Sequence, residues 1–208
     1  LVRSRGLGDV YKRQTLRLTN HHGLMIAGEA ALSNWDAGMD MYIYGKLGNL
    51  TMTKEGINVL MTNLTGKVPP ILQRLDYIRF NGEAAGYLHD LTLTGLFYTG
   101  AGMVKTDVMV SIDEQSMSRT YSGSVASADL DLGKLLNQEK KFGKVDFNVE
   151  LKGFNYKNRY PESYIKGIIS SFEYSQYQYE NIMLDGVYKD GGFNGRLSCL
   201  LYTSPSPR

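Results

Sequence analysis

The sequence predicts a mainly β fold, in which an elongated antiparallel sheet carries two or three short helices. Three observations support this prediction. Apolar and polar residues alternate along several segments, which is typical of strands. Tyrosine, which favours half-buried pleated surfaces, occurs 15 times, and glycine, which favours turns and bulges, occurs 23 times. A hydrophobic content of 42% is ordinary for a folded domain, and we expect neither disorder nor a membrane-spanning segment.

The alternation is clearest in residues 144–153 and 104–112. Apolar side chains recur there at every second position; eight of them are Val104, Val108, Val110, Ile112, Val145, Phe147, Val149 and Leu151. The positions between them are mostly polar, so each strand has one dry and one wet face, as in an antiparallel sheet covered on one side. The dry faces could close into a sandwich core or line an open apolar groove, because both arrangements give this pattern. We name the eight residues as candidate groove lining.

Three segments interrupt the strands with helical signals. Residues 53–66 place apolar residues at helical spacing between a capping residue, Thr53, and a stop, Gly66. Residues 68–75 contain two prolines that can open a further short turn of helix. Residues 131–137 follow a cap, Asp131, with leucines that include Leu136. We expect all three segments to pack on the sheet.

The pattern changes in the last third of the chain, at residues 170–198. Aromatic and aliphatic residues recur there in pairs, and glycines stand at positions 186, 191, 192 and 195. We expect a series of very short strands, with turns at these glycines, that extends the sheet along one axis. No strict repeat period accompanies them, so a regular solenoid is not predicted.

The histidines give little indication of a catalytic or metal site. His21 and His22 stand in a predicted turn and point apart, which suits a shared metal ion poorly. His89 and Asp90 could act as a base and its orienting acid, but no nucleophile is visible, and the pair more simply opens a strand.

The acidic residues suggest little more. Asp129 and Asp131 lack the spacing to a bidentate glutamate that a calcium loop has, and helix capping explains Asp131. Asp113 and Glu114 stand in a polar turn. The segment YKDGGFNG is followed by neither the helix nor the lysine of a phosphate-binding loop and predicts a hairpin turn. We therefore predict no catalytic residue, no metal site, no cofactor and no enzymatic activity.

The two ends of the sequence are related at the level of DNA. Residues 4–14, SRGLGDVYKRQ, can be encoded by a short element whose reverse complement, shifted by one base, encodes residues 199–208, CLLYTSPSPR. Such an element resembles a transposase-type sequencing adapter that was translated with the fragment. We therefore exclude residues 1–14 and 199–208 from the fold prediction and expect the natural protein to be longer.

Residues 15–198 remain as one predicted β segment, with a candidate internal boundary near 137–142. The excluded ends carry five basic residues and one acidic residue, so the remainder has 18 basic and 20 acidic residues, and its net charge is −2 instead of +2. This charge does not favour a nucleic-acid partner. The only cysteine, Cys199, falls in an excluded end, which leaves no disulfide and no cysteine metal site in the segment.

Several motifs resemble the translocation and assembly module family, TamB, in the form found in Bacteroidetes, within the AsmA-like superfamily. They are DLGKLL at residues 131–136, the GKV-F---LKG pattern at 143–153, and the long IKG-I-SFEY--Y-Y-NI-LDG-YKDGGFNG pattern at 165–195. The resemblance extends over essentially all of residues 15–198.

The resemblance implies a periplasmic location in a double-membrane bacterium, with an inner-membrane anchor outside this segment. It implies a curled sheet, open along one side like a taco, whose apolar groove conducts phospholipid towards the outer membrane by holding the acyl chains. It also implies help in assembling and secreting outer-membrane proteins with a partner barrel. A β-rich surface or adhesion module that binds through its tyrosines is the alternative.

Overall fold

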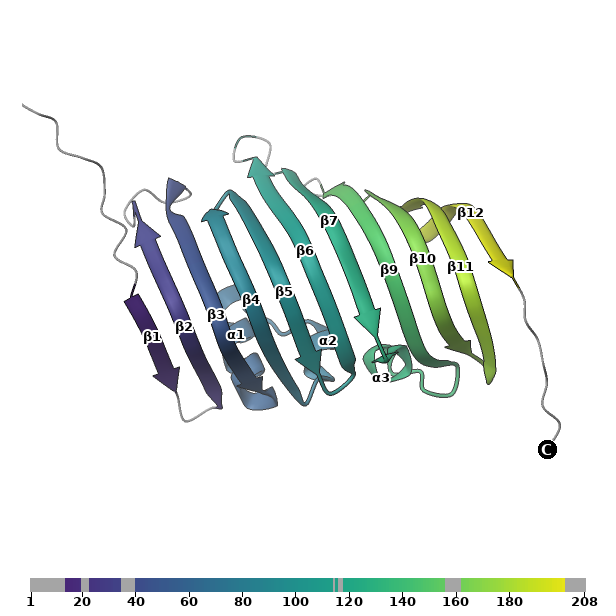
Figure 1. The fold of residues 1–208 in the computed structure, drawn as a ribbon, viewed down its shortest axis with the longest axis horizontal. Helices are drawn as coiled ribbons and strands as arrows, with labels where there is room; N and C mark the ends of the chain where they lie inside the picture. The colour runs from purple at the N-terminus through teal and green to yellow at the C-terminus, as the bar shows by residue number, and fades with distance from the viewer. Residues whose placement is uncertain are drawn as a thin grey trace, which may run out of the picture.

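The computed structural model describes residues 14–19, 23–34, 40–113, 115, 118–155 and 162–200, and it is mainly β. Within these residues, eleven strands form one antiparallel sheet in which each strand pairs with the next along the chain, and the two-residue strand β8 also pairs with β9 (Figure 1). The strands are β1 Gln14–Thr19, β2 Leu24–Ser33, β3 Tyr42–Thr53, β4 Tyr77–Tyr87, β5 Asp90–Thr99, β6 Gly102–Asp113, β7 Ser118–Ala128, β8 Leu130–Asp131, β9 Phe142–Asn155, β10 Glu162–Tyr174, β11 Tyr177–Lys189 and β12 Gly192–Leu200.

Three short helices form where the sequence predicts them: α1 Lys54–Thr65, α2 Pro70–Gln73 and α3 Leu132–Leu136. The side chain of Thr53 accepts a hydrogen bond from the backbone N–H of Gly56, and Gly66 ends α1 in the left-handed conformation. Asp131 caps α3 by accepting a hydrogen bond from the backbone N–H of Lys134 at 2.8 Å. Each cap satisfies a backbone group that a helix end would otherwise leave without a partner.

In Figure 1, α1 and α2 lie behind the sheet and α3 lies at the strand ends between β7 and β9; residues of α1 and α3 belong to one core cluster, so both pack on the same face of the sheet. The core lies between them and the strands; its buried members are Ile57, Leu75, Ile78, Ala101, Leu130, Leu135 and Val145. Ile57 is 1% exposed and is the most deeply buried large side chain among the described residues. Leu136, which was expected to dock, is 42% exposed, because α3 is a single turn and adjacent helical residues point in different directions.

Cross-strand register joins the predicted dry sides of separate strands into one continuous face. Val108 pairs with Gly123, and Gly123 pairs with Leu151, so these residues share a face of the sheet. We call the face that carries them and the helices the apolar face, and the opposite one the polar face.

The sheet is neither closed nor strongly curled, which differs from the expected taco-like curl (Figure 1). Strong curvature requires bulges or kinks within the sheet. The four central pairings, from β4 to β9, run without a register shift, and shifts occur only in pairings nearer the two ends of the sheet. Within the described residues no second sheet covers the apolar face, so a closed sandwich is not formed there either.

The last third of the chain contradicts the prediction of very short strands, because β10 and β11 have 13 residues each. Asn181 adopts a positive φ of 54° within β11, and the bulge there breaks the alternation that would mark one long strand. Gly186 and Gly195 are not turns but face each other in mid-strand. The hairpin turn predicted for YKDGGFNG is confirmed between β11 and β12, at residues 190–191, where both φ angles are positive as in a type I′ turn.

The predictions about the two ends fall mostly outside the described residues, which begin at Gln14 and end at Leu200. Gln14 begins β1, and Cys199 and Leu200 end β12. The candidate boundary near 137–142 coincides with the turn between α3 and β9, and the sheet continues across it because β7 pairs directly with β9.

Candidate functional site

The apolar face has two halves that differ in what covers them. In the covered half, the helices pack against the strand ends beside them, and the sheet side chains there include Ile78, Phe97 and Val104. In the open half, towards the opposite strand ends, no described helix lies over the sheet (Figure 1). The open half includes the half-buried or exposed side chains of Leu91, Leu93, Val108, Val110, Leu151 and Ile165.

The eight residues predicted to line a groove all lie on the apolar face, but they divide between its halves. Val145 is buried in the core cluster, and Val104 and Phe147 pack against that cluster. Val149 is 9% exposed and lies at the border of the two halves. The other four lie in the open half: Val108, Val110, Ile112 and Leu151. Sequence reasoning could not separate the two groups, because the helices that cover the first group come from other parts of the chain.

Sequence reasoning also missed residues of the open half. Leu91 and Leu93 of β5 pair with Val110 and Val108, and Ile165 of β10 pairs with Leu151. Apolar and polar residues alternate in residues 90–99 as clearly as in residues 104–112 and 144–153, so the same pattern could have identified them.

Aromatic rings lie over glycines on the apolar face. A Cβ atom added to Gly82 or to Gly95 would lie 2.6 Å from a ring carbon of Phe80, and one added to Gly153 would lie 2.5 Å from Cζ of Tyr121. These glycines let the rings lie close to the sheet instead of standing upright on it. Along the rows of cross-strand neighbours that contain these glycines, few side chains project from the apolar face. A long ligand would therefore meet few obstructions there.

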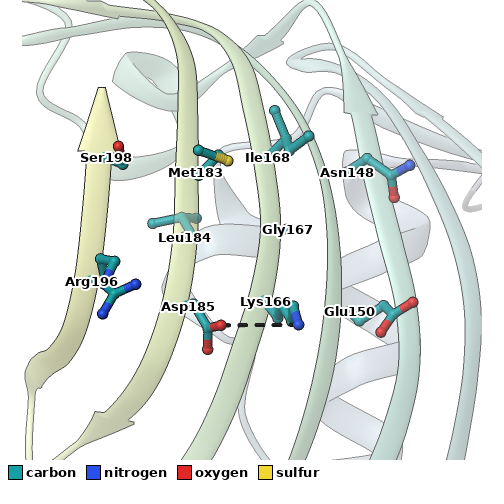
Figure 2. Close-up of a pocket in the computed structure, with 10 residues that line it drawn as sticks. All are labelled: Asn148, Glu150, Lys166, Gly167, Ile168, Met183, Leu184, Asp185, Arg196 and Ser198. Carbon is teal, nitrogen blue, oxygen red and sulfur yellow. Dashed lines mark ion pairs between the residues drawn. The ribbon is translucent and has the colours of Figure 1, made fainter. Parts of the chain in front are cut away.

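The polar face carries cross-strand charge pairs. Glu150, Lys166, Asp185 and Arg196 lie opposite one another on four successive strands, so that acidic and basic residues alternate (Figure 2). The ammonium of Lys166 lies 4.0 Å from the carboxylate of Asp185. Tyr164 donates a hydrogen bond to Asp185 at 2.6 Å, which raises the pKa of the Tyr164 hydroxyl. Opposite charges at such positions stabilise the pairing of neighbouring strands.

The same region of the polar face is hollowed. A shallow cavity of about 570 Å³ lies beside the charge row, with the exposed side chains of Ile168 and Met183 in its lining (Figure 2). Its two basic and two acidic residues balance, so the cavity has no net charge that would select a charged ligand.

Three hydrogen bonds connect α3 to α2 and to the chain segments beside β4 and β5. Lys134 at α3 donates a hydrogen bond to Asp76, which precedes β4, at 2.6 Å, and to the backbone carbonyl of Gly100 at 3.2 Å. Arg74, at the end of α2, donates to the backbone carbonyl of Leu135. The hydrogen bond with Lys134 lowers the pKa of Asp76, and the same bond raises the pKa of Lys134. The covered half is thus stabilised by hydrogen bonds at its surface as well as by an apolar core.

The residues that suggested acid–base or metal chemistry have other partners. His89 lies 3.6 Å from the carboxylate of Asp40 and stacks on Tyr87, while Asp90 accepts a hydrogen bond from Ser111. His89 and Asp90 therefore do not form a dyad.

Two further candidate sites resolve differently. Asp129 forms an ion pair with Lys144 at 2.9 Å, and Asp131 is the predicted helix cap. No group of three or more potential metal ligands occurs within the described part of the chain, and His21 and His22 lie outside it.

An aromatic cluster occupies the apolar face beside α3. Phe142 lies 5.4 Å from Tyr174 and 6.3 Å from Phe172 between ring centroids, and Phe172 lies 6.4 Å from Tyr179. Tyr177, which pairs with Tyr174 across the hairpin, is 60% exposed. These rings form a surface that could bind a partner without an acyl chain.

Comparisons with known proteins add no relative: no family model, curated protein or solved structure matches the chain. The resemblance to the TamB family therefore rests on the sequence motifs alone and stays a prediction. Among the helices that the structure describes, the longest has 12 residues, and none is long and apolar enough to cross a membrane.

Proposed function

We propose that this chain is a segment of a periplasmic protein, anchored in the inner membrane elsewhere, that conducts phospholipid between the two membranes of a double-membrane bacterium. In this proposal the acyl chains of the lipid lie on the open half of the apolar face. Help in the assembly and secretion of outer-membrane proteins, with a barrel partner, belongs to the same proposal through the resemblance to TamB. The proposed role requires no catalytic residue and no cofactor.

The observation that carries the proposal is the uncovered apolar surface itself. Neighbouring strands contribute aliphatic side chains at paired positions, as Leu93 and Val108 do, and Val110 is 39% exposed. Contiguous exposed apolar surface of this kind marks an interaction site more often than an ordinary protein surface. Val110 and Leu151 lie on strands separated only by β7, so the surface continues from strand to strand.

The physical reason for such a surface is the cost of moving a lipid through water. Each methylene exposed to water costs about 0.8 kcal/mol, so a long acyl chain needs continuous cover along its path. A sheet face with alternating apolar residues provides this cover without chemistry, and the polar face keeps the other side in contact with water. Because the sheet is neither closed nor strongly curled, one chain of this kind supports a lipid from one side only.

The aromatic cluster supports the alternative, a β-rich surface or adhesion module that contacts protein or glycan through tyrosine. Tyr174 is exposed and lies 5.4 Å from Phe142 and 6.1 Å from Phe172 between ring centroids, and the exposed Tyr177 pairs with Tyr174. This surface lies beside α3, away from Val110 and Leu151, so the two functions can be tested separately.

A pair of photo-crosslinking positions tests the proposal in a double-membrane bacterium that expresses the full chain. Leu151 lies on the open half of the apolar face, and its neighbour Lys152 lies on the polar face. Photoreactive residues at these two positions therefore probe opposite faces of the same part of β9. We expect phospholipid to be captured from position 151 and not from position 152. Val149 and Phe147 are less suitable positions because they are nearly buried or packed against the core.

Two outcomes count against the proposal. Equal capture from positions 151 and 152 indicates contact with lipid that is not specific to a face. Capture of protein or glycan from position 177, with no lipid at position 151, favours the binding module.

A further inference from the structure

The apolar face carries a single charged side chain among the described strands, and that side chain is Arg119. The register places it there, because Arg119 pairs with Ile112 on one side and with Asn155 on the other. It is the second residue of β7, at the rim of the open half and at the end of the strand that is far from α3. The Arg119 side chain is exposed, and its guanidinium forms no hydrogen bond or ion pair with another residue that the structure describes.

Polar groups surround Arg119 at this rim. Tyr121, two residues along β7, extends its ring over Gly153, and its hydroxyl contacts the hydroxyl of Ser163 on β10. Asn155 lies directly opposite Arg119 on β9. Residues two apart on one strand are roughly 7 Å apart, and neighbouring strands are about 4.8 Å apart. The rim therefore places a guanidinium, two hydroxyls and an amide on one face of three neighbouring strands, with their backbones within roughly 12 Å of one another.

No carboxylate shares this face within the described strands. The nearby acidic residues Asp113 and Glu162 occupy positions that face the polar side, as their pairing with Ser118 and Phe154 indicates. A guanidinium with no acidic neighbour on its face is open to an external anion. Arginine binds phosphate with two parallel hydrogen bonds, and hydroxyl and amide donors can complete the site.

The apolar rows begin directly beside the rim. Val110 pairs with Tyr121, and Leu151 lies one row further along β9 from Gly153, so aliphatic side chains border the polar groups. A ligand that satisfies both parts has an anionic head and an apolar tail. A free phosphate ion uses the rim alone and leaves the neighbouring apolar surface exposed to water.

We propose that Arg119, with Tyr121, Asn155 and Ser163, binds the phosphate of a phospholipid whose acyl chains lie on the open half of the apolar face. This inference rests on the proposed function and adds a headgroup position to it. Arg119 then fixes the orientation of the lipid: the headgroup lies at the rim, and the chains extend towards the row of Val108 and Leu151. Because the described residues of the site carry one positive charge and no negative charge, we expect it to select an anionic headgroup over a zwitterionic one.

Titration of the purified full chain with short-chain lipids tests this site. The probes are dihexanoylphosphatidylglycerol, which is anionic, dihexanoylphosphatidylethanolamine, which is zwitterionic, dihexanoylglycerol, which has no phosphate, and inorganic phosphate. We expect the wild type to bind the anionic lipid most tightly. We expect Arg119→Gln to weaken that binding about tenfold while leaving dihexanoylglycerol unchanged, because a charge-assisted pair is lost and the apolar contacts remain.

Two further variants keep the test specific. Arg119→Lys retains the charge without the paired donors and should bind the anionic lipid with intermediate affinity. Arg79→Gln removes an exposed arginine from the polar face and should change nothing. Thermal unfolding of each variant checks that the fold is retained.

The outcomes separate this inference from the proposed function. If Arg119→Gln binds the anionic lipid as the wild type does, the headgroup site is wrong while the acyl surface stands. If inorganic phosphate binds as tightly as the anionic lipid, the rim is a simple anion site and the inference is also wrong. If neither lipid nor dihexanoylglycerol binds to the wild type, and position 151 captures no lipid in cells, the proposed function fails and this inference fails with it.

Discussion

The two halves of the apolar face have the same alternating sequence and differ in their cover. Val104 and Val110 stand on the same strand and the same face, yet Val104 packs against the core cluster while Val110 is exposed. The difference comes from the helices. In the chain, α1 and α2 lie between β3 and β4, and α3 lies between β8 and β9; all three pack near the same end of the sheet. Alternation thus decides which face a residue occupies, and insertions between strands decide whether that face is buried.

The largest expected effect tests whether the covered half supplies the stability. Ile57 is almost fully buried between α1 and the sheet, so Ile57→Ala should leave a cavity and destabilise the fold by about 2–5 kcal/mol. The matched change in the open half, Val110→Ala, should cost about 0.5 kcal/mol or less, because that side chain is already exposed. Urea unfolding of both variants measures the difference. Similar losses at both sites would mean that something covers the open half.

The border between the halves can be tested at a glycine. A Cβ atom on Gly82 would meet the backbone oxygen of Thr94 and would lie 2.6 Å from both Gly95 Cα and Phe80 Cζ. We expect Gly82→Ala to destabilise the sheet by about 1–3 kcal/mol through overpacking.

Gly45 provides the control on the same face, because nothing lies within 4 Å of an added Cβ atom there. Gly45→Ala should leave stability unchanged or raise it slightly. Urea midpoints of the two variants check the contrast, and equal midpoints would show that Phe80 does not rest on the glycine pair.

The sequence predicts much of this fold because its signals are local. Thr53, Gly66 and Asp131 mark helix ends through contacts within one turn, and residues 144–153 show their face through alternation alone. The division of the apolar face could not be predicted in this way. Leu130, Leu135 and Val145 become core because α3 folds back on β9, which is a tertiary contact.

Two further features escaped prediction for related reasons. The bulge at Asn181 conceals one long strand, because the alternation on its two sides is out of phase. The position of Arg119 on the apolar face depends on register across three strands, and no local pattern in the sequence indicates which face this arginine occupies.

The smallest expected effect concerns the ion pair between Lys134 and Asp76 at the surface of the covered half. The hydrogen bond from Lys134 lowers the pKa of Asp76, so Asp76 contributes stability above its unfolded-state pKa of about 3.9 and loses it as pH falls through the lower folded-state value. The raised pKa of Lys134 acts at the other limit, since its contribution is present below an unfolded-state pKa of about 10.4 and is lost as pH rises through the folded-state value. Asp76→Asn should therefore remove part of the acid sensitivity of the urea midpoint below pH about 4, together with a small part of the stability at neutral pH.

Glu150→Gln, on the polar face and away from the helices, is the matched control for this change. It removes a carboxylate that lies opposite Lys166 without altering any contact of the helices, so its effect on the urea midpoint reports cross-strand pairing alone. If the two variants have the same pH profile, the tie between Lys134 and Asp76 does not hold the helices on the sheet. In that case the boundary between the covered and open halves depends on the apolar core alone, and the helices could lift from the sheet without breaking a specific ion pair.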